Sequence, residues 1–137
     1  MQGYNVIVVF DESAQHVLMC KRRKEPFKGL KNFVGGKIEK GEDSLNAAYR
    51  ELREETGITR DDIMLTRLMD YTYYLADCYL EVYAGRLRRH TEVSGDENEL
   101  CWEELSQDFF DAERFAGLGN IGHIMAQIEL YKEQALQ

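Results

Sequence analysis

The sequence predicts an α/β protein in which a mixed β-sheet lies between helices. Strand-like segments occur on both sides of one amphipathic helix over residues 43–56, and a second helix-like segment lies near the end of the chain. No repeat, linker-like stretch or low-complexity tract interrupts this order. A chain of 137 residues is long enough to bury its own core, so we expect a single domain over residues 1–137.

The first part of the chain predicts a β-hairpin. Tyr4–Phe10 is rich in β-branched and aromatic residues, which is typical of a buried strand. The segment "DESAQ" supplies a turn, and His16–Arg22 is a second strand. A basic loop over Lys24–Lys31 follows, and "NFVGGKI" then predicts a short strand that is broken by a pair of glycines.

The clearest element is a helix over Asp43–Thr56. Its apolar residues recur at helical spacing and form one stripe: Leu45, Ala48, Tyr49 and Leu52. Gly57 follows at the position where glycine commonly ends a helix.

The second half of the chain predicts two long strands, a brief strand and a helix. The long strands are expected over Met64–Tyr74 and Ala76–Arg88, where apolar residues alternate with polar or aromatic ones. After a polar loop, "LCW" predicts a brief strand. The final helix is expected over Asn120–Gln134, because isoleucines recur there at helical spacing.

Three acidic residues lie close together on the helix over residues 43–56. Glu51 is three and four residues from Glu54 and Glu55, so the three side chains are neighbours on the helix surface. Like charges placed in this way repel one another, and the repulsion grows where water is excluded. These glutamates flank the apolar stripe and should border a cleft. The pattern therefore predicts that a cation binds on this face.

Composition limits the classes of function. The net charge of −8 argues against general nucleic-acid binding, which needs a basic surface. The longest apolar run, Val6–Phe10, is too short to span a bilayer, and no signal peptide is evident. The three cysteines, Cys20, Cys78 and Cys101, match no zinc or disulfide framework. We therefore expect a cytoplasmic protein with reduced thiols and no membrane partner.

The segment "GKIEKGEDSLNAAYRELREETGI" resembles the Nudix box. Every fixed position of that motif is matched: Gly36, Glu42, Arg50, Glu51, Leu52, Glu54, Glu55, Gly57 and Ile58. Within the family, the resemblance extends to MutT-like members and to oxidised-purine nucleoside triphosphatases. It implies a Nudix-type α/β/α sandwich with the box at residues 36–58.

The resemblance also implies a metal site and a catalytic group. Glu51, Glu54 and Glu55 are the implied ligands of Mg²⁺, for which Mn²⁺ can substitute, and the Gly36 carbonyl is a further candidate ligand. Arg50 is implied to pair with Glu42 and to orient the loop against the helix. Such ions bridge to phosphate oxygens and lower the pKa of bound water.

Outside the box, two segments supply further candidates. "DENELCW" resembles the distal loop that brings another glutamate to the metals in MutT-type proteins. Glu97 is the first candidate as a metal ligand or general base, and Glu99 is the alternative. Arg22 and Arg23, or Lys24, can hold the polyphosphate, although an ordinary basic strand end explains them equally well.

Two asparagines and two phenylalanines are candidate substrate-binding residues. Asn32 stands where the oxidised-purine triphosphatases have an asparagine that meets the base, and an amide can read a purine edge. The alternative is a turn-forming asparagine. Phe33 or Phe27 can stack on the base. Asn120 is a second candidate base reader, or else the cap of the final helix.

The resemblance implies a magnesium-dependent pyrophosphohydrolase that cleaves a nucleoside diphosphate linked to another group. The expected substrate is an oxidised or ordinary purine (deoxy)nucleoside triphosphate, cleaved to a monophosphate and diphosphate. Glu51, Glu54, Glu97 and Arg50 form the expected catalytic group. Homodimers are common in the family, so a homodimer is one possible assembly.

Other functions stay open at the level of sequence. The chain has no proline after Pro26, which disfavours ADP-ribose hydrolases, whereas Tyr73 or Tyr74 matches a mark of dinucleoside polyphosphate hydrolases. A nucleotide-sensing module without turnover would not need all three carboxylates. An isoprenoid diphosphate isomerase would need a catalytic cysteine in the pocket.

Overall fold

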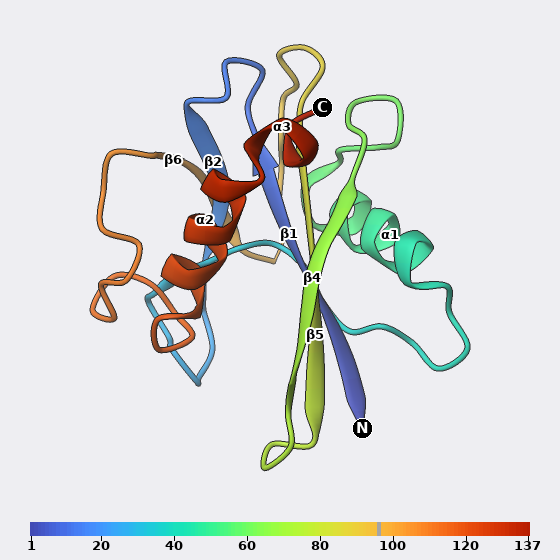
Figure 1. Ribbon diagram of the computed structural model, residues 1–137, viewed down its shortest axis with the longest axis vertical. Coiled ribbons are helices and arrows are strands. Elements are labelled where there is room, and N and C mark those ends of the chain that lie inside the picture. The colour runs from blue at the N-terminus through green and yellow to red at the C-terminus, as the bar shows by residue number, and fades with distance from the viewer. Residues whose placement is uncertain (96) are drawn as a thin grey trace.

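The computed structural model describes residues 1–95 and 97–137 (Figure 1). Its strands and helices follow the order expected from the sequence. The strands are β1 (Gln2–Phe10), β2 (His16–Lys21), β3 (Lys31–Asn32), β4 (Thr66–Tyr73), β5 (Cys78–Arg86) and β6 (Glu99–Glu104). The helices are α1 (Ser44–Thr56), α2 (Asn120–Leu130) and α3 (Lys132–Ala135).

The strands form one mixed sheet in the order β3-β2-β1-β5-β4. The sixth strand, β6, lies off this path and pairs with β2. β1 and β5 run parallel along their whole lengths, from Gln2 opposite Cys78 to Phe10 opposite Arg86. The other strand pairs are antiparallel, including the predicted hairpin of β1 and β2. The predicted mixed sheet is therefore confirmed.

Helices cover both faces of the sheet, with α1 on one side and α2 and α3 on the other (Figure 1). On the α1 side, Ala48 and Leu52 pack against Ile7, Val9 and Tyr83. On the opposite side, isoleucines of α2 pack against alternate residues of the same strands. Because successive strand residues point to opposite faces, β1 and β5 contribute to both hydrophobic cores. This α/β/α arrangement was predicted from the sequence.

Several element boundaries differ from the prediction. The final helix is interrupted at Tyr131, whose backbone leaves the helical region and separates α2 from α3. Leu45 is not part of the buried stripe of α1, because 38% of its surface is exposed; Ala47 is buried in the same turn. "NFVGGKI" forms only the end of β3 and isolated bridges at Val34 and Lys37.

The strand predicted from "LCW" is longer than expected. β6 extends over Glu99–Glu104 because it pairs along the whole length of β2, from His16 opposite Glu104 to Lys21 opposite Glu99. This pairing places the residues just before β6 beside those just after β2.

No helix in the described part of the chain is both long enough and apolar enough to cross a lipid bilayer.

Candidate active site

Helix α1 carries three glutamates along the edge of its buried face. The Asp43 side chain caps the first turn by accepting a hydrogen bond from the Asn46 N–H at 3.0 Å. Gly57 ends the helix in a left-handed conformation, with φ of 83°. Because the helix is fixed at both ends and packed through Leu52, the direction of its acidic edge is fixed as well.

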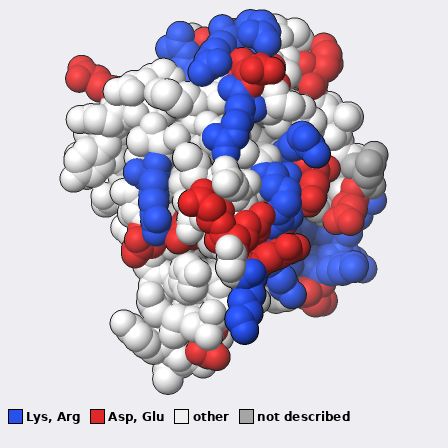
Figure 2. All heavy atoms as spheres, turned by 90° about the vertical axis from the view of Figure 1, so that its right-hand side faces the viewer, with Lys and Arg blue, Asp and Glu red and all other residues white. Residues whose placement is uncertain are grey.

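The three glutamates line a small hollow together with residues from a segment distant in the chain. This hollow has a volume of about 160 Å³ and is called here the acidic hollow. Its lining residues are Glu51, Glu54, Glu55, Glu97, Asn98 and Leu100. Acidic and basic side chains lie intermixed on the side of the molecule that α1 covers (Figure 2). Of the two rival residues in the distal loop, Glu97 lines this hollow, whereas Glu99 lies in β6 opposite Lys21.

The distal loop is attached directly to the end of α1. The Ser94 N–H donates a hydrogen bond to the Thr56 carbonyl at 3.1 Å. Thr56 follows Glu55 in the chain, and Ser94 is three residues before Glu97. This backbone contact therefore holds the segment that carries Glu97 over the C-terminal turn of α1.

The carboxylates of the acidic hollow destabilise one another. Burial raises the pKa of Glu55 to about 7, and the neighbouring Glu51, Glu97 and Glu54 carboxylates raise it further, while a hydrogen bond from the Gly35 N–H opposes the rise. Burial also raises the pKa of Glu51, against the lowering effect of Arg50. A cation in the hollow would relieve this repulsion.

Arg50 connects the loop before α1 to the acidic residues. Its guanidinium donates to both carboxylate oxygens of Glu42, at 2.7 Å from Nε and 2.9 Å from Nη2. Nη1 donates to Glu51 at 3.0 Å and to Glu54 at 3.2 Å, and Nη2 also reaches the Lys37 carbonyl at 3.1 Å. These contacts raise the pKa of Arg50, chiefly through Glu42.

The glycine pair Gly35–Gly36 runs beside the acidic hollow. The Gly35 N–H donates to Glu55 at 3.3 Å, and a Cβ on Gly36 would come within 2.5 to 2.7 Å of the Glu51 carboxyl group. Only glycine allows the loop to approach Glu51 this closely. Asn5 holds Gly36 in place, since the Asn5 N–H donates to the Gly36 carbonyl and the Gly36 N–H donates to Asn5 Oδ1.

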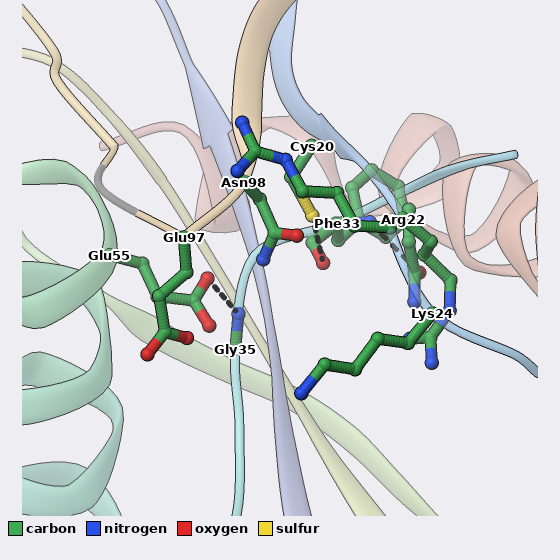
Figure 3. A pocket seen from close by; sticks show the side chains of 10 residues that line it. Cys20, Arg22, Lys24, Phe33, Gly35, Glu55, Glu97 and Asn98 are labelled. Carbon is green, nitrogen blue, oxygen red and sulfur yellow. Dashed lines mark hydrogen bonds between the residues drawn. The ribbon is translucent and has the colours of Figure 1, made fainter. Parts of the chain in front are cut away.

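A larger cavity of about 520 Å³ adjoins the acidic hollow; it is called here the basic cavity. In Figure 3, Glu55 and Glu97 lie on one side of this cavity and the Lys24 side chain extends into it from the other. Its lining residues are Cys20, Arg22, Arg23, Lys24, Asn32, Phe33, Gly35, Glu55, Glu97 and Asn98.

The structure separates the four predicted substrate-binding residues. Arg23, Asn32 and Phe33 line the basic cavity, whereas Asn120 does not belong to its described lining. Asn120 does not cap α2 either, because Gly119 occupies the cap position and no side-chain hydrogen bond is made there. The capping alternative for Asn120 is therefore wrong, and its role as a base reader stays a prediction.

Asn32 was predicted as a base reader and Phe33 as a stacking residue, and both line the basic cavity. The Phe33 N–H donates to Asn32 Oδ1 at 2.9 Å, so Asn32 makes a local contact as well as lining the cavity. Phe33 is only 4% exposed, because it packs into the core on the α2 side. Its ring forms part of the cavity floor and does not offer an open stacking surface; Phe27 is not in the described lining.

Cys20 lines the basic cavity but has little thiolate character. Its thiol is buried, and burial raises its pKa to about 12, with the Glu55 charge adding to the rise. A thiol that stays protonated is a poor nucleophile, so the arrangement disfavours chemistry that depends on a catalytic cysteine.

The tyrosines that match the mark of dinucleoside polyphosphate hydrolases lie elsewhere. Tyr73 and Tyr74 are exposed at the turn between β4 and β5, and neither belongs to the described lining of the basic cavity. Their position does not support that function.

The chemistry of the acidic hollow fits a divalent metal ion, since four carboxylates line it and their charges repel. Among the described residues, however, no three acidic, histidine or cysteine side chains converge closely enough to hold an ion as they stand. Glu51 and Glu54 are turned toward Arg50, and Glu55 toward Gly35. Binding of an ion would therefore require these carboxylates to move closer together.

Comparison with known proteins agrees with this architecture. Residues 1–123 match the family model of the NUDIX domain. Because this match includes most of the chain, the protein belongs to the Nudix family, as its sequence motif indicated. Over 47 residues the chain is 43% identical to an ADP-ribose pyrophosphatase of Methanocaldococcus jannaschii, a match that spans 34% of this chain and 28% of that enzyme.

Solved structures with the same fold include proteins of different function. A MutT structure from a study of Aliivibrio salmonicida and Vibrio cholerae has a TM-score of 0.73 and 20% identity, with coverage of 94% of this chain and 98% of that one. An Ap4A hydrolase of C. elegans has a TM-score of 0.74 and 17% identity, with coverage of 97% and 98%. The NUDIX domain of Shewanella oneidensis NrtR, complexed with ADP ribose, has a TM-score of 0.73 and 17% identity, with coverage of 95% and 87%. At these identities the similarity establishes the fold alone.

Two residues near the site were not predicted from the sequence. Asn98 lines both the acidic hollow and the basic cavity, and Asn5 holds Gly36 from β1. Neither lies in the Nudix box. Asn98 directly follows the predicted Glu97. Asn5 lies in β1, and no sequence pattern indicated that it would contact the glycine pair.

Proposed function

We propose that this protein is a metal-dependent pyrophosphohydrolase that cleaves a nucleoside diphosphate linked to another group. The observation that carries this proposal is the direct contact of two oppositely charged spaces. The acidic hollow and the basic cavity share Glu55, Glu97 and Asn98 as lining residues. A diphosphate lying across that boundary would have basic side chains on one side and carboxylates on the other.

The acidic hollow is the proposed site for Mg²⁺, with Mn²⁺ as a substitute. Glu51, Glu54, Glu55 and Glu97 would hold it. The Gly36 carbonyl, which also accepts a hydrogen bond from the Asn5 N–H, is the proposed further ligand. When bound, the metal neutralises phosphate oxygens and lowers the pKa of a bound water. A manganese ion is present with AMP in the structure of a bifunctional enzyme from Francisella tularensis that shares this fold.

The reaction is an attack by water on one phosphorus of the diphosphate. A bond forms between the water oxygen and phosphorus, the bridging P–O bond breaks, and the bonding electrons remain on the leaving phosphate. The water proton passes to a carboxylate of the acidic hollow, and Glu97 is the proposed acceptor because it lines both spaces. Arg50 donates to one oxygen of Glu51 and one oxygen of Glu54, which leaves the second oxygen of each carboxylate for the metal.

The proposed substrate is a purine (deoxy)nucleoside triphosphate, either oxidised or ordinary, cleaved to monophosphate and diphosphate. Three cationic side chains, those of Arg22, Arg23 and Lys24, line the basic cavity and can bind a polyphosphate chain. The Asn32 amide lines the same cavity, and its Nδ2 group can donate to a base while Oδ1 accepts from Phe33.

ADP-ribose is the second candidate substrate. It is favoured by the 43% identity to the Methanocaldococcus jannaschii ADP-ribose pyrophosphatase over 47 residues. The absence of a proline after Pro26 counts against it. Both candidates contain the same diphosphate linkage, so the site chemistry described above applies to each.

We also propose that the protein acts in the cytoplasm. Its three cysteines are free, and no disulfide links them. Reduced thiols are typical of cytoplasmic proteins.

The test is product analysis with a panel of nucleotides in the presence of Mg²⁺. The panel contains dGTP, 8-oxo-dGTP, ATP, ADP-ribose and dinucleoside polyphosphates, and the products are separated by ion-exchange chromatography. We expect release of a nucleoside monophosphate and diphosphate from a purine triphosphate. Tight binding of a panel member without turnover of any would overturn the proposal in favour of a sensing module.

A further inference from the structure

We propose that the Asn98 side-chain amide binds the diphosphate group of the substrate at the boundary between the acidic hollow and the basic cavity. The inference rests on the proposed function and names a contact within that site. Of the three residues that line both spaces, Glu55 and Glu97 carry carboxyl groups, and Asn98 is the uncharged one.

The backbone places Asn98 beside the basic residues. In the pairing of β2 with β6, Lys21 lies opposite Glu99. The next residues outward are Arg22 on one strand and Asn98 on the other, so the strand register brings them to the same edge of the cavity. The hydrogen bond from the Ser94 N–H to the Thr56 carbonyl holds the loop before β6 against α1, and this contact keeps Asn98 close to Glu55.

The side chain of Asn98 is available to a ligand. In Figure 3 it extends into the cavity between Glu97 and Phe33, and no hydrogen bond joins it to the other described residues drawn there. A carboxylate at this point would repel phosphate oxygens, whereas the amide Nδ2 donates hydrogen bonds without carrying a charge. An amide donor therefore suits a place where a diphosphate passes close to carboxylates.

Such a contact distinguishes diphosphates from monophosphates. A monophosphate can be held by the basic side chains alone, and it need not reach the boundary. A diphosphate spans the boundary and gains the hydrogen bond from Asn98. Loss of a hydrogen bond to a charged group lowers affinity by roughly ten- to hundredfold.

The experiment compares the binding of α,β-methylene-ADP, which is not hydrolysed, with that of AMP, using isothermal titration calorimetry in Mg²⁺. We expect Asn98→Ala to weaken binding of α,β-methylene-ADP by roughly tenfold or more and to leave AMP binding within about twofold. Asn98→Asp should weaken it further through repulsion, and Asn98→Ser should retain part of the affinity. Asn46→Asp adds the same charge on the outer face of α1 and serves as the control.

Three outcomes would overturn the inference. These are unchanged binding of α,β-methylene-ADP by Asn98→Ala, an equal loss for both ligands, and the failure of wild-type protein to bind α,β-methylene-ADP. Thermal unfolding midpoints that match the wild type would show that the variants are folded. Because binding is measured without turnover, a failure of the proposed hydrolysis in the nucleotide panel is seen separately from a failure of this contact.

Discussion

Arg50 and Glu42 form a bidentate ion pair, in which Nε and Nη2 of the guanidinium reach the two carboxylate oxygens at 2.7 and 2.9 Å. The same guanidinium contacts Glu51 and Glu54 through Nη1. Glu42 thus fixes the orientation of a group that in turn positions two acidic residues. Glu42 itself is not in the lining of the acidic hollow.

Replacement of Glu42 by Gln should reduce activity without a large loss of stability. The amide can accept only one of the two hydrogen bonds, so Arg50 becomes less well oriented and the proposed metal ligands less ordered. We expect kcat/KM to fall roughly tenfold, as for other residues that orient metal ligands. Steady-state kinetics at several Mg²⁺ concentrations would measure this, with Arg53→Lys on the same helix as the control. Activity equal to that of the wild type would show that the ion pair has no part in orienting the site.

Replacement of Glu54 by Gln should abolish turnover while the fold is retained. Glu54 is 56% exposed, so the neutral side chain costs little in packing, but it removes an anionic ligand from the acidic hollow. We expect kcat to fall by roughly a hundredfold or more. The same change at Glu129, on the exposed face of α2, is the control. Near-normal turnover of Glu54→Gln at saturating Mg²⁺ would contradict the proposed metal site.

The elevated pKa of Glu55 predicts that the metal-free protein loses stability as the pH rises. Its folded-state pKa is about 7 and its ordinary value is 4.5, so the unfolded chain releases this proton first. The free energy of unfolding should therefore fall between pH 4.5 and 7. The raised pKa of Glu51 acts in the same direction. Thermal unfolding from pH 5 to pH 8 measures the effect, which Glu55→Gln should reduce.

Added Mg²⁺ should reverse this trend, because a cation favours the ionised carboxylates. We expect Mg²⁺ to raise the unfolding midpoint more at pH 8 than at pH 5. Equal pH dependence in wild type and Glu55→Gln, together with no effect of Mg²⁺ in either, would contradict the assignment of Glu55. Glu129→Gln should behave like the wild type.

Replacement of Gly36 by Ala should displace Glu51. The new Cβ would lie within 2.5 to 2.7 Å of the Glu51 carboxyl group, so either the side chain or the loop must move. We expect a fall of roughly tenfold or more in kcat/KM, comparable to that of Glu42→Gln. Gly122→Ala is the control: the three atoms nearest its Cβ belong to the Phe110 ring, at 2.4 to 2.7 Å, so an exposed side chain that does not line the acidic hollow must shift instead. Full activity of Gly36→Ala would show that close approach of the loop to Glu51 is dispensable.

The main features of the fold were predictable because they depend on local patterns. The stripe through Ala48 and Leu52 and the glycine at position 57 together indicated α1 in the sequence, whereas the cap at Asp43 became evident only in the structure. β1 was recognised because its consecutive apolar residues fill both hydrophobic cores, and β5 was recognised from its alternating residues. The motif then indicated the family directly.

The parts that were missed depend on tertiary contacts. Phe33 has an aromatic ring that could stack on a base, but the ring is buried in the hydrophobic core on the α2 face of the sheet. Asn98 becomes part of the site through the register of β6 against β2, which cannot be read from either strand alone. The break at Tyr131 likewise has no proline or glycine to mark it.

The parallel pairing of β1 with β5 has a consequence for how the protein assembles. Ile7 and Val9 of β1 and Tyr83 of β5 form the surface on which α1 docks, although α1 lies between the two strands in the chain. During synthesis, α1 therefore leaves the ribosome before the platform beneath it is complete. Pairings between distant segments also form slowly. The glutamates of α1 can reach their final positions only after the chain has been translated through β5. A nascent chain stalled before that point would contain the complete motif but not the complete surface on which α1 packs.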